Sequence, residues 1–205
     1  MSKILFIIGH PDLANDSVVT KEVVNILKSE FPQSTFSVLS ELYKNFQIDV
    51  KAEQDKAKDA DLIVFVYPIF WYGFPSLLER WVEVVFVHGF GHGSKGKVKG
   101  KKLIAAFTTG AAESFYTHEG AFKYTVEEFF EPKLKNLCGL CEINYCGYVF
   151  TGGVSYFLRT DPAKKEELLK AAKNHANKII EKIKSTQKII IIEQINNYYG
   201  IIKLI

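Results

Sequence analysis

The sequence predicts a doubly wound α/β fold, in which an open five-stranded parallel sheet carries helices on both faces. Short apolar runs alternate along the chain with segments of helical periodicity, the pattern of consecutive strand–helix–strand units. Several of the apolar runs are continuous, which is typical of strands buried on both faces. A closed barrel needs eight such units and more chain than these 205 residues provide. The expected strand order is 2-1-3-4-5.

The strand predictions rest on runs rich in β-branched and aromatic residues. The first run, ILFII at residues 4–8, is short and wholly apolar. The second, TFSVLSEL at residues 35–42, alternates between apolar and polar side chains. The last three runs are DLIVFVY, KLIAAFTT and INYCGYVF, at residues 61–67, 102–109 and 143–150. Each run is expected to form one strand of the sheet.

The helix predictions rest on apolar spacing and on signals at the helix ends. Ser17 precedes a segment, residues 18–31, in which apolar side chains recur at helical spacing. Residues 51–60 form a short charged helix, and residues 75–86 begin with a proline, which suits a first helical turn. A further helix is expected over about residues 122–137. A long amphipathic helix over residues 161–183 is expected to be capped by Asp161.

No repeat or linker divides residues 1–185, which we therefore predict to be a single domain. Residues 186–205 are rich in isoleucine and asparagine and are predicted to be a C-terminal extension. Three interpretations of this extension stay open: an added strand, a segment that docks on a partner, or a frayed end. Its Glu, Gln, Asn and Lys residues argue against a membrane span.

The composition argues against several classes of protein. The net charge of +3 and the pI near 8.6 are too weakly basic to indicate a nucleic-acid-binding protein. The apolar run at the N-terminus is too short for a signal peptide, so we expect a cytoplasmic protein. Three cysteines, at positions 138, 141 and 146, are an odd number and do not make a disulfide framework. They also lack the fourth ligand of a zinc site, and no metal is predicted.

Three unusual loops follow the first, third and fourth expected strands, whose carboxyl ends meet at one edge of the sheet. The first, GHPDLANDSVVTK, leads into a helix N-terminus that favours an anion, and His10, Ser17 and Thr20 add polar groups. The second, PIFWYGFP at residues 68–75, offers flat rings to a planar ligand. The third begins with TTG at residues 108–110, small enough for close approach of a ligand. Taken alone, the first loop could simply contain a helix cap, the second an apolar surface patch and the third a turn. Taken together, the three loops indicate a site for a flavin nucleotide.

The sequence resembles a known family, the NAD(P)H:quinone oxidoreductases of the flavodoxin-like fold, over about residues 3–160. This family includes DT-diaphorase-like enzymes, modulator-of-drug-activity proteins and ancillary subunits of glutathione-gated potassium efflux systems. The resemblance rests on the first loop, on FQIDVKAEQDKAKDADLIVFVYPIFWYGFPSLLERWVEVVFVHGFGHG, and on TTGAAESFY followed by FFEPKLKNLCGL. It implies a flavodoxin-like, flavin-dependent enzyme that reduces quinones with NAD(P)H in a ping-pong reaction. It also implies a homodimer with the active site at the interface.

The resemblance further implies which residues form the site. The flavin phosphate and ribityl end would be held by His10, Ser17, Val19 and Thr20. The isoalloxazine would be lined by Pro68, Ile69, Phe70, Trp71 and Tyr72. Its edges would be covered by Thr108, Thr109, Gly110, Ala111 and Tyr116. The predicted catalytic residues are Tyr116 and His118, which would shuttle charge and bind substrate. Thr20 and Ala111 stand where asparagine and glycine are common in the family.

Several alternatives stay open. FMN is the expected cofactor and FAD the alternative, while NADH versus NADPH and the physiological acceptor are undecided. A second interpretation is a regulatory flavoprotein of a potassium efflux channel, a membrane-protein partner that would dock on the basic loop near residues 95–102 or on the C-terminal extension. A one-electron carrier is disfavoured because such carriers are usually strongly acidic. Glycines 91, 93 and 96 match G-x-G-x-x-G, but they follow a helix and lead into a strand, so a loop is expected there.

Overall fold

A computed structural model describes residues 2–202, and it describes side chains over residues 2–189 apart from Tyr156. It contains a five-stranded sheet in the order β2-β1-β3-β4-β5, in which every neighbouring pair is parallel. The strands are β1 (Ile4–Ile8), β2 (Thr35–Val38), β3 (Leu62–Pro68), β4 (Lys102–Thr108) and β5 (Asn144–Thr151). The predicted fold class and strand order are confirmed.

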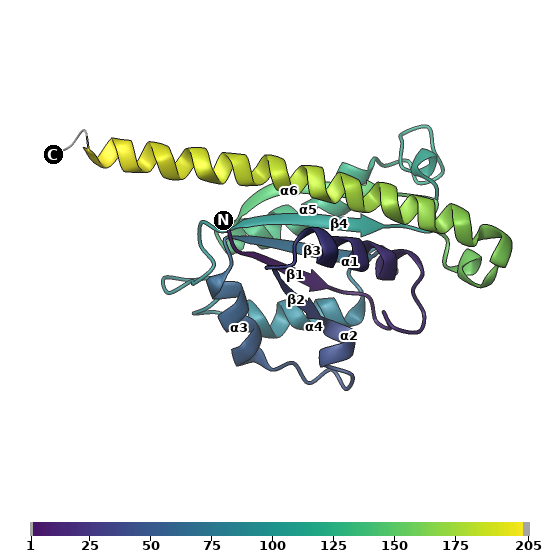
Figure 1. Ribbon diagram of the computed structural model, residues 1–205, viewed down its shortest axis with the longest axis horizontal. Coiled ribbons are helices and arrows are strands. Elements are labelled where there is room, and N and C mark those ends of the chain that lie inside the picture. The colour runs from purple at the N-terminus through teal and green to yellow at the C-terminus, as the bar shows by residue number, and fades with distance from the viewer. Residues whose placement is uncertain (1, 203–205) are drawn as a thin grey trace.

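Helices cover both faces of this sheet. The α-helices of the described chain are α1 (Val19–Glu30), α2 (Leu39–Leu42), α3 (Val50–Asp59), α4 (Ser76–Val85), α5 (Val126–Leu140) and α6 (Lys165–Ile202). Figure 1 shows α1 and α6 on one face and α3 and α4 on the other. Short 3-10 turns are η1 (Glu113–Phe115), η2 (Tyr156–Thr160) and η3 (Pro162–Lys164). Within residues 2–202, none of these helices is both long enough and apolar enough to cross a bilayer.

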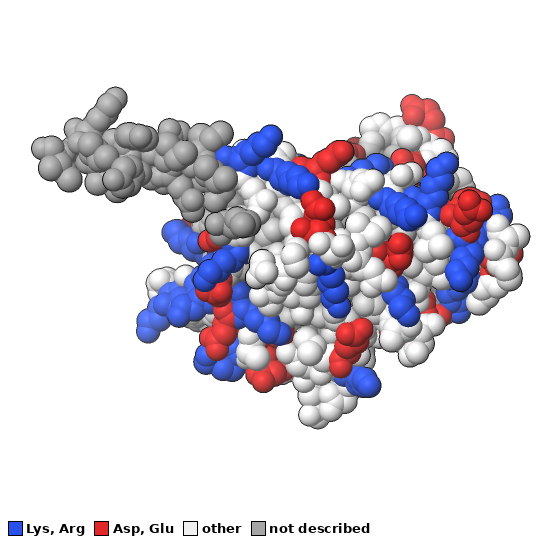
Figure 2. Space-filling model, viewed as in Figure 1, with Lys and Arg blue, Asp and Glu red and all other residues white. Residues whose placement is uncertain are grey.

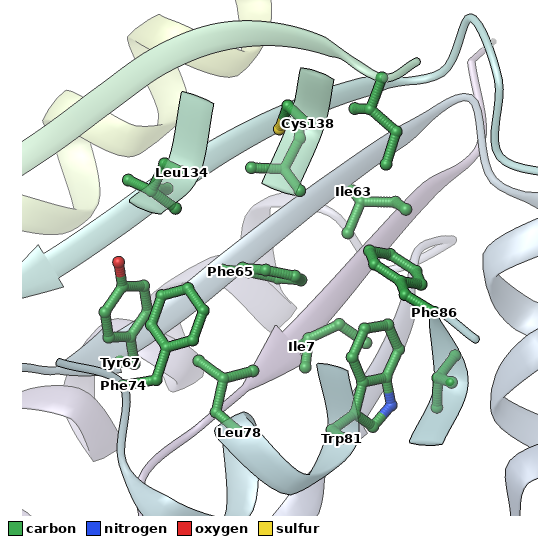
Figure 3. Close-up of a cluster of buried hydrophobic side chains, with 14 of the residues drawn as sticks. Ile7, Ile63, Phe65, Tyr67, Phe74, Leu78, Trp81, Phe86, Leu134 and Cys138 are labelled. Carbon is green, nitrogen blue, oxygen red and sulfur yellow. The ribbon is translucent and has the colours of Figure 1, made fainter. Parts of the chain in front are cut away.

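Both faces of the central strands β1, β3 and β4 are buried, because successive side chains point to opposite sides of the sheet and helices pack on each side. Figure 3 shows one of the two resulting cores, with Phe65 of β3 lying between α4 and α5. Its ring meets Trp81 of α4 edge to face, with the ring centroids 5.9 Å apart. The second core packs Phe6, Val64 and their neighbours against α1 and α6. Strands that are apolar on both faces therefore appear in the sequence as the continuous runs noted above.

A buried carboxylate ties the edge of the sheet to the helices beside it. Glu53 of α3 is fully buried and its two oxygens accept hydrogen bonds from Trp81 Nε1 and the Tyr43 hydroxyl, both at 2.8 Å. Ser37 donates to the same carboxylate at 3.1 Å, and the ammonium group of Lys56 lies 2.6 Å from it. Every oxygen of this buried charge is thus satisfied, as a buried ion requires.

The boundaries of the second strand and of α5 differ from prediction. The second predicted strand ends at Val38, because residues 39–42 form α2 instead of continuing the strand. Helix α5 begins at Val126, later than expected, because Thr125 makes a capping box with Glu128: the Glu128 N–H donates to the Thr125 hydroxyl while the Thr125 N–H donates to the Glu128 carboxylate. The α5 helix also continues to Leu140, three residues beyond the predicted end.

The last helix is longer than predicted. Asp161 caps η3 by accepting a hydrogen bond from the Ala163 N–H, and α6 begins only at Lys165. Helix α6 then runs through the predicted extension to Ile202, and Figure 1 shows it continuing past the edge of the sheet. The interpretation of the extension as an added strand is therefore wrong for residues 186–202, and residues 203–205 lie outside the described residues. The domain boundary near residue 185 stays a prediction; among the side chains that the structure describes, Thr186 of α6 is still buried.

The charged side chains are spread over the visible surface rather than gathered in one patch. Figure 2 shows lysines and arginines interspersed with aspartates and glutamates over the face that carries α1 and α6. An ion pair between these two helices joins Lys184 to Glu30, with the nitrogen 2.6 Å from the oxygen. A mixed surface of this kind agrees with the weak net charge of the sequence and offers no basic stripe for a nucleic acid on this face.

Candidate functional site

A cavity of about 380 Å³ opens at the carboxyl edge of the sheet, where the three predicted loops meet. From the first loop it is lined by His10, Ser17, Val19 and Thr20. From the second and third loops it is lined by Pro68, Ile69, Phe70, Thr108, Thr109 and Gly110. A volume of this size is typical of a pocket for a small ligand. The structure therefore brings these predicted residues together in one site.

The remaining residues of the predicted flavin site line a second, smaller hollow of about 240 Å³. Trp71, Tyr72, Ala111 and Tyr116 form its wall together with Phe122. It shares Ile69, Thr109 and Gly110 with the large cavity, so the two hollows adjoin at the second and third loops.

Backbone hydrogen bonds fix the loops relative to one another. The Ile69 N–H donates to the Thr108 carbonyl at 2.8 Å, which extends the pairing of β3 with β4 into the site. The Thr109 N–H donates to the Thr151 carbonyl at 3.1 Å, and the Val154 N–H donates back to the Thr109 carbonyl at 2.9 Å. The third loop is thus held on both sides, and the segment after β5 becomes part of the same site.

The start of α1 presents unused donors to the cavity. The helix has Val18 at its N-cap position, with no side-chain cap there. The Ser17 hydroxyl accepts a hydrogen bond from the Lys21 N–H at 3.2 Å, so Ser17 satisfies part of the first turn from one position earlier. The N–H groups of Val19 and Thr20 make no hydrogen bond to any residue that the structure describes. Free N–H groups at a helix N-terminus bind anions.

His10 supplies a further donor. Its side chain is only 6% exposed, and its Nδ1 accepts a hydrogen bond from the Asp12 N–H at 3.1 Å. Burial lowers the pKa of His10 to about 4, so the ring is neutral near pH 7. Because Nδ1 is an acceptor, the neutral ring carries its proton on Nε2. Nε2 bonds to none of the described residues, and it therefore offers an N–H to a ligand in the cavity.

The aromatic loop contains a strained turn. Phe70 and Gly73 exchange two backbone hydrogen bonds, at 3.2 and 3.0 Å, around the central residues Trp71 and Tyr72. Both central residues have positive φ, 47° and 63°, where turns of this kind normally place Asn and Gly. The Trp71 side chain is 94% exposed. The chain thus accepts backbone strain to hold an aromatic ring in solvent beside the smaller hollow, a feature that concentrates at functional sites.

The two predicted catalytic residues differ in their surroundings. Tyr116 is buried among aromatic rings, with the Phe122 centroid 4.9 Å away. Burial raises the pKa of its hydroxyl, and a hydrogen bond with Thr109 opposes that shift, so the phenol stays protonated near pH 7. His118 lines neither hollow; its side chain is 61% exposed, and its Nε2 lies 2.7 Å from a Glu128 oxygen at the start of α5.

The segment after β5 also lines the large cavity, and no sequence pattern predicted it. Ser155, Phe157 and Arg159 line the cavity from this segment, and Asp16 lines it from the first loop. Arg159 Nε lies 2.6 Å from an Asp16 oxygen, an ion pair between residues 143 positions apart. The one available signal was composition, because Arg159 is one of only two arginines beside many lysines.

Fold and site together define a flavodoxin-type α/β protein with its ligand cavity at the strand ends. The chain matches the model of the "Flavodoxin-like fold" family over residues 2–180. It is 34% identical over 184 residues to a Bacillus subtilis protein named as an uncharacterized NAD(P)H oxidoreductase, covering 89% of this chain and 98% of that protein. The chain therefore belongs to the flavodoxin-like family, and the resemblance recognised from the motifs is confirmed.

Two further relatives bear on the site. A glutathione-regulated potassium-efflux ancillary protein, KefF of an Enterobacter species, is 46% identical over 79 residues, which are 38% of this chain and 45% of that protein. General stress protein 14 of Treponema denticola, solved in complex with FMN, superposes with a TM-score of 0.76 at 27% identity. That likeness covers 88% of this chain and 99% of the solved chain.

Proposed function

We propose that this protein is an FMN-dependent NAD(P)H oxidoreductase that reduces quinones or similar electrophiles by two electrons. The observation that carries the proposal is the large cavity, whose lining combines unpartnered N–H donors with apolar and aromatic side chains. A flavin mononucleotide needs both kinds of surface, because it joins a phosphate to a planar ring system.

The residues present fit this cofactor. The N–H groups of Val19 and Thr20 and the Nε2–H of His10 would donate to phosphate and ribityl oxygens. Pro68, Ile69 and Phe70 would lie along the ring system, and the backbone of the third loop would cover its edge. Bound FMN would supply the redox chemistry, while the chain binds the ring and excludes water from it. The FMN in the Treponema structure supports this choice over FAD. The NAD(P)H oxidoreductase name of the Bacillus relative supports a nicotinamide nucleotide as the electron donor.

The smaller hollow is the proposed place for the electron acceptor. It adjoins the large cavity through Thr109 and Gly110, and its walls are aromatic, which suits a quinone ring. The Tyr116 hydroxyl stays protonated near neutral pH and would donate a hydrogen bond where negative charge develops during the reaction. NAD(P)H and the quinone would use this space in turn, as a ping-pong reaction requires.

The exposed turn favours a homodimer. Trp71 is 94% exposed and Tyr72 is 56% exposed, both beside the smaller hollow. Aromatic residues are enriched in the buried centres of protein interfaces. A second copy packed over this turn would shield both rings and add a wall to the acceptor site.

Steady-state kinetics test the proposal. The FMN-loaded protein is expected to oxidise NADH or NADPH with a simple benzoquinone, giving parallel double-reciprocal lines when both substrates are varied. Tyr116→Phe is expected to lower kcat with little effect on FMN affinity, because it removes only the hydroxyl. His118→Ala tests the second predicted catalytic residue, whose exposure and pairing with Glu128 place it outside both hollows. Absence of quinone-dependent turnover in an FMN-loaded protein would contradict the proposal.

A second candidate is regulation of a potassium efflux channel, favoured by the 46% identity with KefF over 79 residues. In that case flavin binding would persist while the physiological readout would be channel activity. Co-purification with a candidate efflux channel, compared with a variant truncated after Lys188, would separate this role from a stand-alone enzyme.

A further inference from the structure

The ion pair between Arg159 and Asp16 lies inside the proposed cofactor cavity. Both residues line that cavity, and Arg159 Nε is 2.6 Å from an Asp16 carboxylate oxygen. The side chains are 25% and 38% exposed, so the pair is neither sealed in the core nor free on the surface. Such partly exposed pairs contribute little to stability, and a second ligand can compete for the guanidinium.

The charges around the cavity indicate that Arg159 is needed for an anion to bind there. The titratable residues among the described lining are His10, Asp16 and Arg159. His10 is neutral near pH 7, which leaves one negative and one positive side chain. A phosphate monoester carries about −1.5 to −2 charge near neutral pH. The helix N-terminus contributes about +0.5. Without Arg159, a phosphate at the start of α1 would face Asp16 with no side-chain cation of the cavity lining to offset the repulsion.

Lys21, the lysine in the first turn of α1, makes its hydrogen bond elsewhere. Lys21 follows the first loop, but its ammonium group donates to the Ala14 carbonyl at 2.8 Å and braces the loop from outside the described cavity lining. Arg159 differs because its guanidinium is held at the cavity wall. It is also the residue type best suited to a phosphate, since its planar group can donate two parallel hydrogen bonds.

The segment that carries Arg159 is fixed to the rest of the site. The Val154 N–H donates to the Thr109 carbonyl at 2.9 Å, and the Gly153 N–H donates to the Ala111 carbonyl at 2.8 Å. Within η2, the Leu158 N–H donates to the Ser155 carbonyl at 3.0 Å. These contacts attach η2 to the third loop, so Arg159 is positioned by the same backbone that would cover the flavin.

We propose that Arg159 is a ligand of the cofactor's terminal phosphate and that Asp16 holds the guanidinium in place until the phosphate displaces it. This inference rests on the proposed function, since it concerns the phosphate of a flavin nucleotide in the same cavity. It predicts that the protein discriminates FMN from riboflavin, which has the same ring and ribityl chain but no phosphate, mainly through Arg159.

Flavin titrations of the apo protein, followed by quenching of flavin fluorescence, test the proposal. Arg159→Ala is expected to weaken FMN binding by about 10- to 100-fold, the effect of losing hydrogen bonds from a charged group. Riboflavin binding is expected to stay within about twofold of wild type, because a deleted phosphate contact leaves the ring contacts intact. Arg159→Lys should recover part of the loss, because the charge remains but the paired donors do not. Asp16→Asn should bind FMN at least as tightly as wild type and leave riboflavin unchanged.

Arg80→Ala is the matched control, because Arg80 is the other arginine and pairs with Glu83 on the exposed face of α4. It should alter neither affinity. An unchanged FMN affinity in Arg159→Ala would overturn the inference and leave the proposed function standing, as would an equal loss of FMN and riboflavin, which indicates a structural role. A wild-type protein that binds neither flavin would overturn both proposals. Retained riboflavin binding also shows that a variant is folded.

Discussion

Gly110 offers a perturbation in which stability and cofactor binding should move in opposite directions. A Cβ added to Gly110 would meet only Ser155 Cα, at 3.5 Å, which is ordinary van der Waals contact. The residue is outside the left-handed φ region, so Gly110→Ala is compatible with the folded backbone. A compatible Gly→Ala change stabilises a protein by about 0.4–1 kcal/mol, because it restricts the unfolded chain.

The same methyl group is expected to obstruct the flavin. If FMN lies against the backbone of the third loop, the added methyl overpacks that contact, which costs about 1–3 kcal/mol. At about tenfold per 1.4 kcal/mol, this is a loss of about 5- to 150-fold in FMN affinity. Urea unfolding of the apo protein measures the first effect, and fluorescence titration with FMN measures the second.

Gly139→Ala is the control for this experiment. Gly139 lies in α5, and a Cβ added there would have no atom within 4 Å, so alanine should stabilise the helix by about 0.5–1 kcal/mol and leave FMN binding unchanged. If Gly110→Ala binds FMN as tightly as wild type, the backbone of the third loop does not contact the ligand and this prediction is wrong. It is also wrong if the apo variant is less stable than wild type, because the loop would then need glycine for its own conformation.

Three other predictions follow from strain, burial and titration. Trp71→Asn should raise the unfolding free energy of the apo monomer by about 1 kcal/mol, because asparagine tolerates the left-handed φ and the exposed indole buries little; urea unfolding checks this, and destabilisation would contradict it. Glu53→Ala should cost about 3–5 kcal/mol by stranding its buried partners, whereas Glu83→Ala on the exposed face of α4 should cost at most about 0.5 kcal/mol. Burial lowers the pKa of His10 to about 4 and of His175 to about 3 from the usual 6.5. Between these lowered pKa values of the folded protein and the usual 6.5, only the unfolded chain binds protons at the two histidines. Their contribution to stability should therefore be constant above about pH 7 and decrease from about pH 6.5 towards pH 4. His10→Gln or His175→Gln should each lower the number of protons taken up on unfolding by about one, which is measured as a shallower dependence of the unfolding free energy on pH. An unchanged pH dependence would show that the histidine is not buried in its neutral form.

The central strands and the site edge were predictable because their signals are local. Ile4–Ile8 and Leu62–Pro68 are continuous apolar runs, a pattern that follows from burial on both faces of a sheet. The carboxyl ends of neighbouring parallel strands must meet at one edge, so the loops after them could be grouped without knowing their shapes. The predicted clustering of the first, second and third loops follows from topology alone.

The features that were missed depend on contacts or on competing local signals. Residues 39–42 follow directly on the alternating run TFSV, so they were included in the predicted strand, although Leu39 and Leu42 are three residues apart, as on one face of a helix. The start of α5 was present in the sequence as the Thr125–Glu128 capping box, but the apolar residues before it extended the prediction too far. The ion pair of Asp16 with Arg159 joins residues 143 positions apart, and no local pattern can indicate such a contact.

The left-handed turn at Trp71 and Tyr72 was also beyond sequence analysis, because aromatic residues are not typical of that conformation. At this turn the backbone conformation of the site differs from the one that its residue types favour. The composition change near residue 185 indicated a boundary, yet α6 continues, since no glycine or proline interrupts residues 165–199. A change in composition therefore did not mark a change in secondary structure.

The first experiment to carry out is the anaerobic visible spectrum of the apo protein mixed with FMN, before and after addition of NADPH or NADH. We expect the protein to bind FMN, with a shifted flavin band that bleaches when one equivalent of nicotinamide nucleotide is added. A flavin band that the protein leaves unshifted with both FMN and FAD would show that the cavity at the strand ends is not a flavin site.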